Sequence, residues 1–264
     1  MESKRMKSRQ ILVALIVPIA VLFAGPSRAD ISSTIVKVKP SVVIVGTYKN
    51  TNSPRFSLRG AGFVVGNGNM VITNAHVLQQ PTEEDVEAAL VIQVKTGQNE
   101  WQMRPATVLE VDKLHDLTLL RFDGSAVPAL SVRDSSSVQE GQAIAFMGFP
   151  IGGALGFSPV THRGTVSSIA KMALPTASAQ QLNEQTIRSL RSGSSFDVFQ
   201  LDGTAYPGNS GGPLFDPDSG EVLGVVNMVF IKGTRESALT NPSGISYAIP
   251  SRFIQQLLQR SKPN

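Results

Sequence analysis

The sequence of 264 residues contains no cysteine, one tryptophan and only three histidines. Without cysteine there is no disulfide framework, no thiolate metal site and no thiol to carry a lipid anchor. The histidines, His76, His115 and His162, lie far apart in the chain. We therefore expect neither a metal site nor a cofactor.

A long apolar run is also missing. Residues 11–24 form an apolar stretch of 14 residues interrupted by Pro18, short of the roughly 20 that cross a bilayer. Basic residues precede this stretch, and Ser27-Arg28-Ala29 follows it with small residues at the two positions that signal peptidase reads. Residues 1–29 therefore resemble a signal peptide. We expect export across the inner membrane to the periplasm, without a stable membrane span; the alternative is an uncleaved N-terminal anchor.

The excess of positive charge belongs to the same N-terminal segment. Five of the 24 Lys and Arg residues and one of the 20 Asp and Glu residues lie in residues 1–29, which leaves 19 of each sign in the remainder. A chain without net charge has no electrostatic footprint for nucleic acid. We expect no nucleic-acid partner.

One glycine-rich segment stands out, Pro207-Gly208-Asn209-Ser210-Gly211-Gly212-Pro213. Glycine reaches positive φ without steric cost, so glycines on both sides of Ser210 predict a tight turn that exposes the hydroxyl. The turn directs the N–H groups of Gly208 and Ser210 into one hollow, and the backbone from Gly208 through Asn209 to Ser210 is the predicted oxyanion hole. The alternative is a Gly/Ser/Pro loop without chemistry.

Ser210 needs a general base, because a serine hydroxyl is a weak nucleophile. His76 is the predicted base: it ends an apolar, strand-like run, and the small Ala75 before it leaves room for the imidazole. His115 adjoins a candidate acid in sequence and His162 has no acid nearby. Both are interpreted as bystanders.

The base in turn needs an acid that orients it. Asp116 is the predicted acid, because it opens the apolar run of residues 117–120, where its carboxylate would be partly buried and accept from the imidazole of His76. Asp112 and Asp123 are the alternatives.

Three motifs carry a family resemblance: residues 73–76 (Thr-Asn-Ala-His), 116–120 (Asp-Leu-Thr-Leu-Leu) and 208–214 (Gly-Asn-Ser-Gly-Gly-Pro-Leu). In this order they resemble the trypsin-like serine proteases, and most of all the Deg/HtrA-type branch. The segment 244–251 resembles that branch too, and the likeness covers about residues 31–258.

The resemblance implies an all-β fold of two antiparallel six-stranded β-barrels, with the catalytic groups between them and short helices near both ends. Within a protease domain of residues 30–264, lobe one would cover about residues 31–123 and lobe two about residues 132–258. Residues 175–196 are polar and are interpreted as an insertion in lobe two. About 14 residues follow Pro250, too few for the peptide-binding domain that many family members carry.

Local patterns predict the individual elements. Helical spacing of Ile31, Ile35 and Val38 predicts a first helix, and Ser251 is the expected N-cap of a last one. Residues 49–60 are expected to be a loop, and residues 79–89 a surface helix or loop.

The resemblance also implies a serine endopeptidase that cleaves unfolded or exposed protein segments through a covalent acyl-enzyme. Such an enzyme would act in protein quality control. Its partners would be polypeptides, and the oligomeric state is left open. Two other functions are alternatives: a catalytically weak barrel protein that binds unfolded chains, and an esterase. An esterase of the nucleophile-elbow type needs a helix after the serine, whereas Pro213 and a strand-like pair follow here.

Substrate choice is predicted from two places. Trypsin-like relatives that select basic side chains carry a carboxylate six residues before the nucleophile, where this chain has Thr204. With Val225, Val226 and Asn227 of the expected peptide-pairing strand, Thr204 forms the predicted substrate-binding site, which favours small or medium aliphatic side chains.

Asn209 replaces an Asp that pairs, in many relatives, with a freshly cut N-terminus, so no zymogen cleavage is expected.

Overall fold

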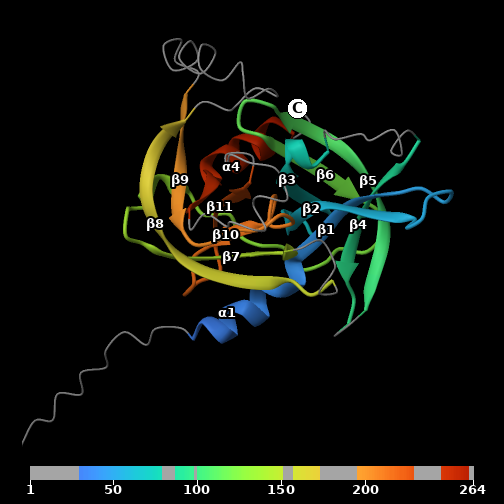
Figure 1. Cartoon of the computed structure of the whole chain (residues 1–264), viewed down its shortest axis with the longest axis horizontal. Helices are drawn as coiled ribbons and strands as arrows, with labels where there is room; N and C mark the ends of the chain where they lie inside the picture. The colour runs from blue at the N-terminus through green and yellow to red at the C-terminus, as the bar shows by residue number, and fades with distance from the viewer. Residues whose placement is uncertain are drawn as a thin grey trace, which may run out of the picture.

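The computed structural model describes residues 30–78, 87–97, 100–150, 157–172, 195–228 and 245–261. In these residues the chain forms two closed, antiparallel, six-stranded barrels and short helices, which confirms the expected all-β fold. Figure 1 shows the barrels next to each other, with β1 to β6 on one side and β7 to β9 on the other.

The first barrel has the strand order β1-β2-β3-β6-β5-β4. Its strands are β1 (Val42–Tyr48), β2 (Phe56–Val65), β3 (Met70–Asn74), β4 (Ala89–Lys95), β5 (Trp101–Asp112) and β6 (Leu117–Phe122). The second barrel has the order β10-β11-β12-β9-β8-β7. Its strands are β7 (Ala143–Gly148), β8 (Val160–Met172), β9 (Phe196–Asp202), β10 (Pro213–Phe215), β11 (Val222–Asn227) and β12 (Ile245–Pro250).

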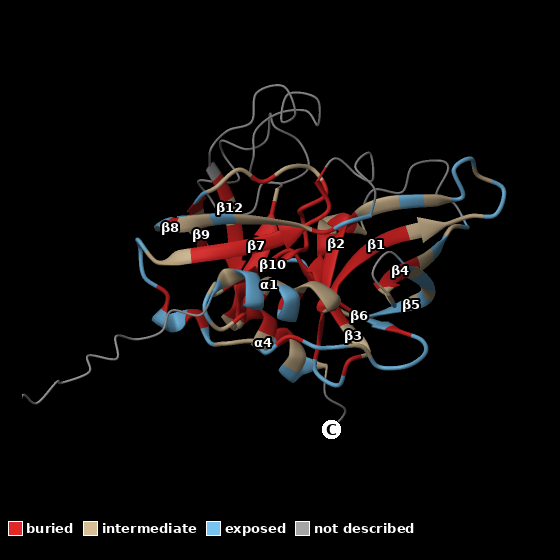
Figure 2. Ribbon diagram, turned by 90° about the horizontal axis from the view of Figure 1, so that it is seen from below, coloured by how far each residue is buried: buried red, intermediate tan, exposed pale blue. Residues whose placement is uncertain are grey.

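Alternate residues of a strand face opposite sides, and here both sides are apolar. In β1, Val43 and Val45 fill the interior of the first barrel, whereas Val42 and Ile44 belong to a core that the two barrels share. The second barrel contributes Phe215 and Val225 to that shared core. Figure 2 shows the buried residues concentrated where the barrels meet. The two barrels therefore share one continuous apolar core.

Residues 123–134, called the crossing segment here, carry the chain from one barrel to the other. Leu130 N donates to Val64 O of the first barrel at 2.9 Å, and Val222 N of the second donates to Ser131 O at 2.8 Å. Leu130 is thus bonded to the first barrel, and the next residue, Ser131, is bonded to the second.

Each terminal helix contacts the opposite barrel. Helix α1 (Ile31–Val38), capped by Asp30, precedes the first barrel, yet Lys37 Nζ donates to Ser219 O between β10 and β11 at 3.1 Å. Helix α4 (Ser251–Arg260) follows the second barrel, yet Arg260 binds Asp112 at the end of β5. The two barrels are therefore held together at both ends of the chain.

Two local expectations are corrected. Strand β2 begins at Phe56 inside the expected loop, because residues 56–60 pair with β1 down to Tyr48. Ser251 is the first helical residue and Pro250 stands at the N-cap position; the Ser251 hydroxyl donates to Arg133 O and caps no helical N–H. The first helix begins at Ile31 and ends at Val38, as predicted.

Several predicted segments lie outside the described residues. They are residues 1–29, most of the segment 79–89 and nearly all of the insertion 175–196. Within the described part of the chain, no helix is long and apolar enough to cross a membrane.

Candidate active site

His76 lies at the end of β3, in the short 3-10 helix η2 (Ala75–Val77). The strand is buried on both faces and pairs with β2 and β6, so it places the helix at one end of the first barrel. The imidazole side chain is 24% exposed. It is therefore accessible, although the strand that carries it is not.

Asp116 lies in the turn between β5 and β6 and has a φ of +52°. Asp is one of the few residues that adopt this left-handed conformation. The backbone carbonyl of Asp116 is held from the side of His76, since it accepts from Ala75 N at 3.1 Å and from Asn74 Nδ2 at 3.0 Å. These contacts bring the predicted acid and the predicted base together.

The Asp116 carboxylate is almost completely buried and fully engaged. Oδ1 accepts from His76 N at 2.8 Å, and Oδ2 lies 2.5 Å from His76 Nδ1 and accepts from Asn227 Nδ2 at 2.6 Å. An ionised carboxylate only accepts hydrogen bonds, so the proton of the neutral imidazole is on Nδ1 and Nε2 is the acceptor. A base prepared in this way takes a proton on Nε2.

Residues 207–213 surround Ser210, the predicted nucleophile, and are called the nucleophile loop here. The loop begins with a type II turn. Pro207 and Gly208 are its central residues, Gly208 has a φ of +102°, and Asn209 N donates to Tyr206 O at 2.9 Å. Among the described residues, the N–H groups of Gly208 and Ser210 have no acceptor. Those two donors remain available to a ligand, whereas the third residue of the predicted oxyanion hole, Asn209, uses its N–H in the turn.

Close approach of the backbone explains the two glycines after Ser210. Gly211 has a φ of +86°, and a Cβ at this position would collide with the carbonyl oxygen of Ala61 in β2. A Cβ on Gly212 would collide with the carbonyl oxygen of Met147 in β7. The loop can therefore lie between the barrels only with glycine at both positions.

The nucleophile loop, which belongs to the second barrel, is hydrogen-bonded to the first. Ala61 N donates to Ser210 O at 2.8 Å, and the Ala61 carbonyl accepts from Thr73 Oγ1 at 2.7 Å. Within the described residues, no hydrogen bond joins Ser210 Oγ to His76. Such bonds commonly form only when substrate is bound.

The predicted substrate-binding residues differ in their positions. The side chains of Val225 and Val226 are completely buried in the core, and Val226 binds the nucleophile loop through both its N–H and its C=O. Asn227 is buried and binds Asp116, so its side chain orients the acid. Thr204 is partly exposed on the segment before the nucleophile loop.

Both histidines interpreted as bystanders have specific contacts. His162 stacks on Phe146 with ring centroids 4.8 Å apart, and its Nε2 lies 3.4 Å from Asn209 Nδ2, directly beneath the nucleophile loop. Burial lowers the pKa of His162. His115 binds Asp112, which excludes Asp112 as the partner of His76. The register of β7 and β8 and the docking of α4 create these contacts, so sequence spacing gave no signal of them.

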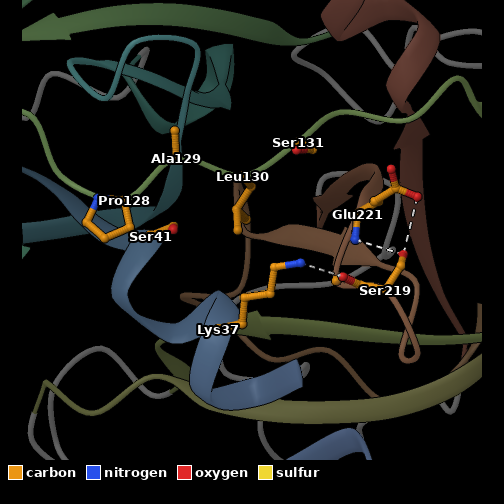
Figure 3. A pocket seen from close by; sticks show the side chains of 9 residues that line it. Lys37, Ser41, Pro128, Ala129, Leu130, Ser131, Ser219 and Glu221 are labelled. Carbon is orange, nitrogen blue, oxygen red and sulfur yellow. Dashed lines mark hydrogen bonds between the residues drawn. The ribbon is translucent and has the colours of Figure 1, made fainter. Parts of the chain in front are cut away.

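A pocket of about 490 Å³ lies elsewhere, between α1, the crossing segment and the turn before β11 (Figure 3). Lys37, Leu130 and Glu221 are among its lining residues, and none of the predicted catalytic residues lines it. The pocket is therefore not the catalytic cleft.

In the described residues, no group of three or more potential metal-binding side chains occurs.

Residues 60–225 match the family described as the trypsin-like peptidase domain. The chain belongs to this family of serine peptidases. It is 30% identical to a serine protease HTR4 of Bos taurus over 234 residues. These matched residues cover 86% of this chain and 40% of the relative. It is 30% identical over 203 residues to a probable periplasmic serine endoprotease DegP-like of Marinomonas sp., which covers 77% of this chain and 35% of the relative.

The trypsin-like peptidase also resembles solved structures. An HtrA-type protease AlgW with tripeptide matches with a TM-score of 0.60 and 22% identity, over 87% of this chain and 62% of that chain. The predicted resemblance to the HtrA/Deg-type proteases is thus confirmed. The chain spans less than half the length of the curated relatives named here.

Proposed function

We propose that this trypsin-like peptidase is a serine endopeptidase in which Ser210 is the nucleophile, His76 the general base and Asp116 the orienting acid. One observation carries the proposal: His76 Nδ1 lies 2.5 Å from the buried Asp116 carboxylate in the first barrel, and β2 of that barrel binds the backbone of the nucleophile loop. The order of the three residues along the chain is the one the family resemblance implies.

The reaction follows from these positions. Ser210 Oγ attacks the carbonyl carbon of the peptide bond while its proton passes to His76 Nε2. The resulting oxyanion accepts from the N–H groups of Gly208 and Ser210, and the buried Asp116 carboxylate stabilises the imidazolium. When the tetrahedral intermediate collapses, the C–N bond breaks and His76 protonates the leaving amine. Water then attacks the acyl-enzyme ester with His76 as the base, which releases the acid and restores the Ser210 hydroxyl.

The proposed substrates are unfolded or exposed polypeptide segments with small or medium aliphatic side chains at the cleaved position. The position of β11 supports this proposal, because the bonds of Val226 to Gly211 and Gly212 place the strand beside Ser210. Thr204 supports the exclusion of basic side chains, since it carries no charge. We place the enzyme in the periplasm, on the signal-like residues 1–29 and the described location of the DegP-like relative.

The experiment is digestion of casein by the purified protein and by its Ser210→Ala variant, with the fragments identified by mass spectrometry. We expect internal cleavage after small or medium aliphatic residues, absent in the variant. Cleavage of a short ester without cleavage of casein would favour an esterase, although β10 follows Ser210 where an esterase elbow has a helix. Casein binding without any cleavage would favour the binding protein.

We also propose that no zymogen cleavage is needed. Asn209 is completely buried, and its neutral amide lies against His162, so no carboxylate waits there for an N-terminal ammonium. A protein that starts with a tag before Asp30, with the tag verified by intact mass, should be fully active. Activity that appears only after tag removal would contradict this proposal.

A further inference from the structure

A second His–Asp pair lies beside the proposed catalytic pair: Asp112 is the last residue of β5, and His115 lies in the turn of four residues between β5 and β6. His115 N donates to Asp112 Oδ1 at 3.1 Å, and His115 Nδ1 lies 2.9 Å from Asp112 Oδ2. Both residues are buried. These two contacts join the end of β5 to the last part of the turn, and Asp116 follows His115 directly in the chain.

The second lobe completes this pair. Arg260 Nη2, at the end of α4, donates to Asp112 Oδ2 at 2.6 Å. The ring of Phe253, also on α4, stacks on His115 with centroids 3.8 Å apart and planes 19° apart. Phe196 of β9 meets the same imidazole edge to face at 4.8 Å. The aromatic and cationic partners of the pair named here therefore all come from the other barrel.

The Asp112 carboxylate is ionised in spite of its burial. Burial alone would raise the pKa of Asp112, but the hydrogen bonds from His115 and Arg260 outweigh that effect and keep the pKa below its usual value. A buried carboxylate is tolerated when it is paired and hydrogen-bonded in this way. The ionised Asp112 can then accept from the turn and from α4 at the same time.

The turn also has to hold an uncommon backbone conformation. Asp116 has a φ of +52°, and a residue outside the ordinary regions keeps that conformation only when its surroundings hold it. Ala75 N and the side-chain amide of Asn74 hold the Asp116 carbonyl from one side. The Asp112–His115 pair holds the preceding part of the turn from the other side.

We propose that Asp112, His115 and Arg260 are positioning residues that fix the Asp116 carboxylate against His76, so that the seating of α4 on the first barrel controls the orientation of the catalytic acid. The inference rests on the proposed role of Asp116. None of the three residues contacts the reacting atoms. They act through the turn backbone.

The test compares two arginines of the same helix. Arg260→Gln removes the contact with the turn, whereas Arg252→Gln removes a more exposed Arg–Asp ion pair with Asp197 of β9, at 2.8 Å, inside the second lobe. For the full-length Arg260→Gln protein we expect kcat to fall about tenfold with little change in KM, because a slightly misplaced catalytic group costs rate and not binding. Arg252→Gln should keep kcat within about twofold.

A conservative variant and a spectroscopic readout separate positioning from stability. Arg260→Lys keeps a cation that can donate to Asp112 and should recover part of kcat. The low-field ¹H NMR signal of His76 Nδ1–H reports the contact with Asp116 without any need for activity. It should shift or broaden in Arg260→Gln and stay unchanged in Arg252→Gln.

Equal losses of kcat in the two glutamine variants would overturn the inference, and so would an unchanged His76 signal in Arg260→Gln. A shifted signal in Arg260→Gln alone would support the inference even if Ser210→Ala still cleaved casein. The failure of the proposed function and the failure of this inference are therefore distinguishable.

Discussion

The two His–Asp pairs of the first barrel have the same internal geometry and different surroundings. In each pair the histidine N donates to one carboxylate oxygen and Nδ1 faces the other, at 2.5 Å for His76–Asp116 and 2.9 Å for His115–Asp112. The His76 side chain is 24% exposed, whereas that of His115 is 11% exposed and lies against two phenylalanine rings. The two histidines therefore differ in the exposure of the imidazole: that of the proposed base is open to solvent, and that of His115 is covered by aromatic rings.

The third partner of each carboxylate differs as well. Asp116 accepts from the neutral amide of Asn227, and Asp112 accepts from the cation of Arg260. A cation compensates the charge of Asp112, whereas an amide orients Asp116 and leaves its negative charge to stabilise an imidazolium. In the proposed catalytic pair the third partner is therefore neutral, and in the other pair it is charged.

The largest effect should come from breaking the catalytic side of the comparison. Ser210→Ala or His76→Ala should lower kcat on the order of 10⁵–10⁶, and Asp116→Ala somewhat less, because the three residues act as a unit. Casein cleavage rates measure the loss, and the double variant should lose little more than either single one. Arg252→Gln, which should keep kcat within about twofold, is the matched control. A Ser210→Ala protein of near wild-type activity would contradict the account.

The next largest effect concerns the third partner of Asp116. Asn227→Ala removes the amide that donates to Oδ2 and should lower kcat about tenfold, since the acid loses one of the contacts that orient it. Steady-state kinetics on a peptide substrate separate kcat from KM. A change confined to KM would mean that Asn227 acts on substrate and not on Asp116.

On the structural side, Asp112→Asn should destabilise the fold. The substitution leaves Arg260 without its carboxylate, and we expect a loss of about 2 kcal/mol at pH 7, below the usual range for a buried pair because Arg260 is half exposed. The pKa of Asp112 is lowered in the folded state, so its contribution is present above the unfolded value of about 3.9 and is lost as pH falls through the folded pKa.

Urea denaturation of the wild type and Asp112→Asn at pH 7 and in strong acid measures this difference. The gap in unfolding free energy should narrow in acid. A gap that is independent of pH would show that the ionised carboxylate is not what stabilises the turn.

The smallest effect concerns His162. Burial lowers its pKa in the folded state, so as pH falls below the unfolded value of about 6.5 only the unfolded chain readily takes the proton. Stability should therefore fall between pH 7 and pH 5, and less so in His162→Gln. Urea denaturation at both pH values measures the difference, with His76 and His115 present in both proteins. Equal losses would exclude His162 as a contributor.

Motifs and patterns in the sequence predicted the two barrels and the contact of His76 with Asp116. The alternation of apolar residues reports strands, and the Asp116 carboxylate opens an apolar strand where it is buried. The contacts of His115 and His162 were not predictable in this way. Phe253 and Arg260 follow His115 by well over a hundred residues, and His162 reaches Asn209 only through the register of β7 and β8.

Asn227 is an instructive case. Its place on a strand near the nucleophile suggested contact with substrate, whereas the closure of the second barrel turns its side chain toward the acid of the first. Sequence position indicates the strand, but the packing of the barrels decides the partner of each side chain.

Covalent labelling by a fluorophosphonate probe, followed by peptide mass spectrometry, tests the central claim most directly. We expect one adduct on Ser210 in the wild type, none in Ser210→Ala and much slower labelling in His76→Ala, because the probe reacts with an activated serine hydroxyl. Casein cleavage by a protein that carries no adduct on Ser210, or that is labelled only at another residue, would contradict the account.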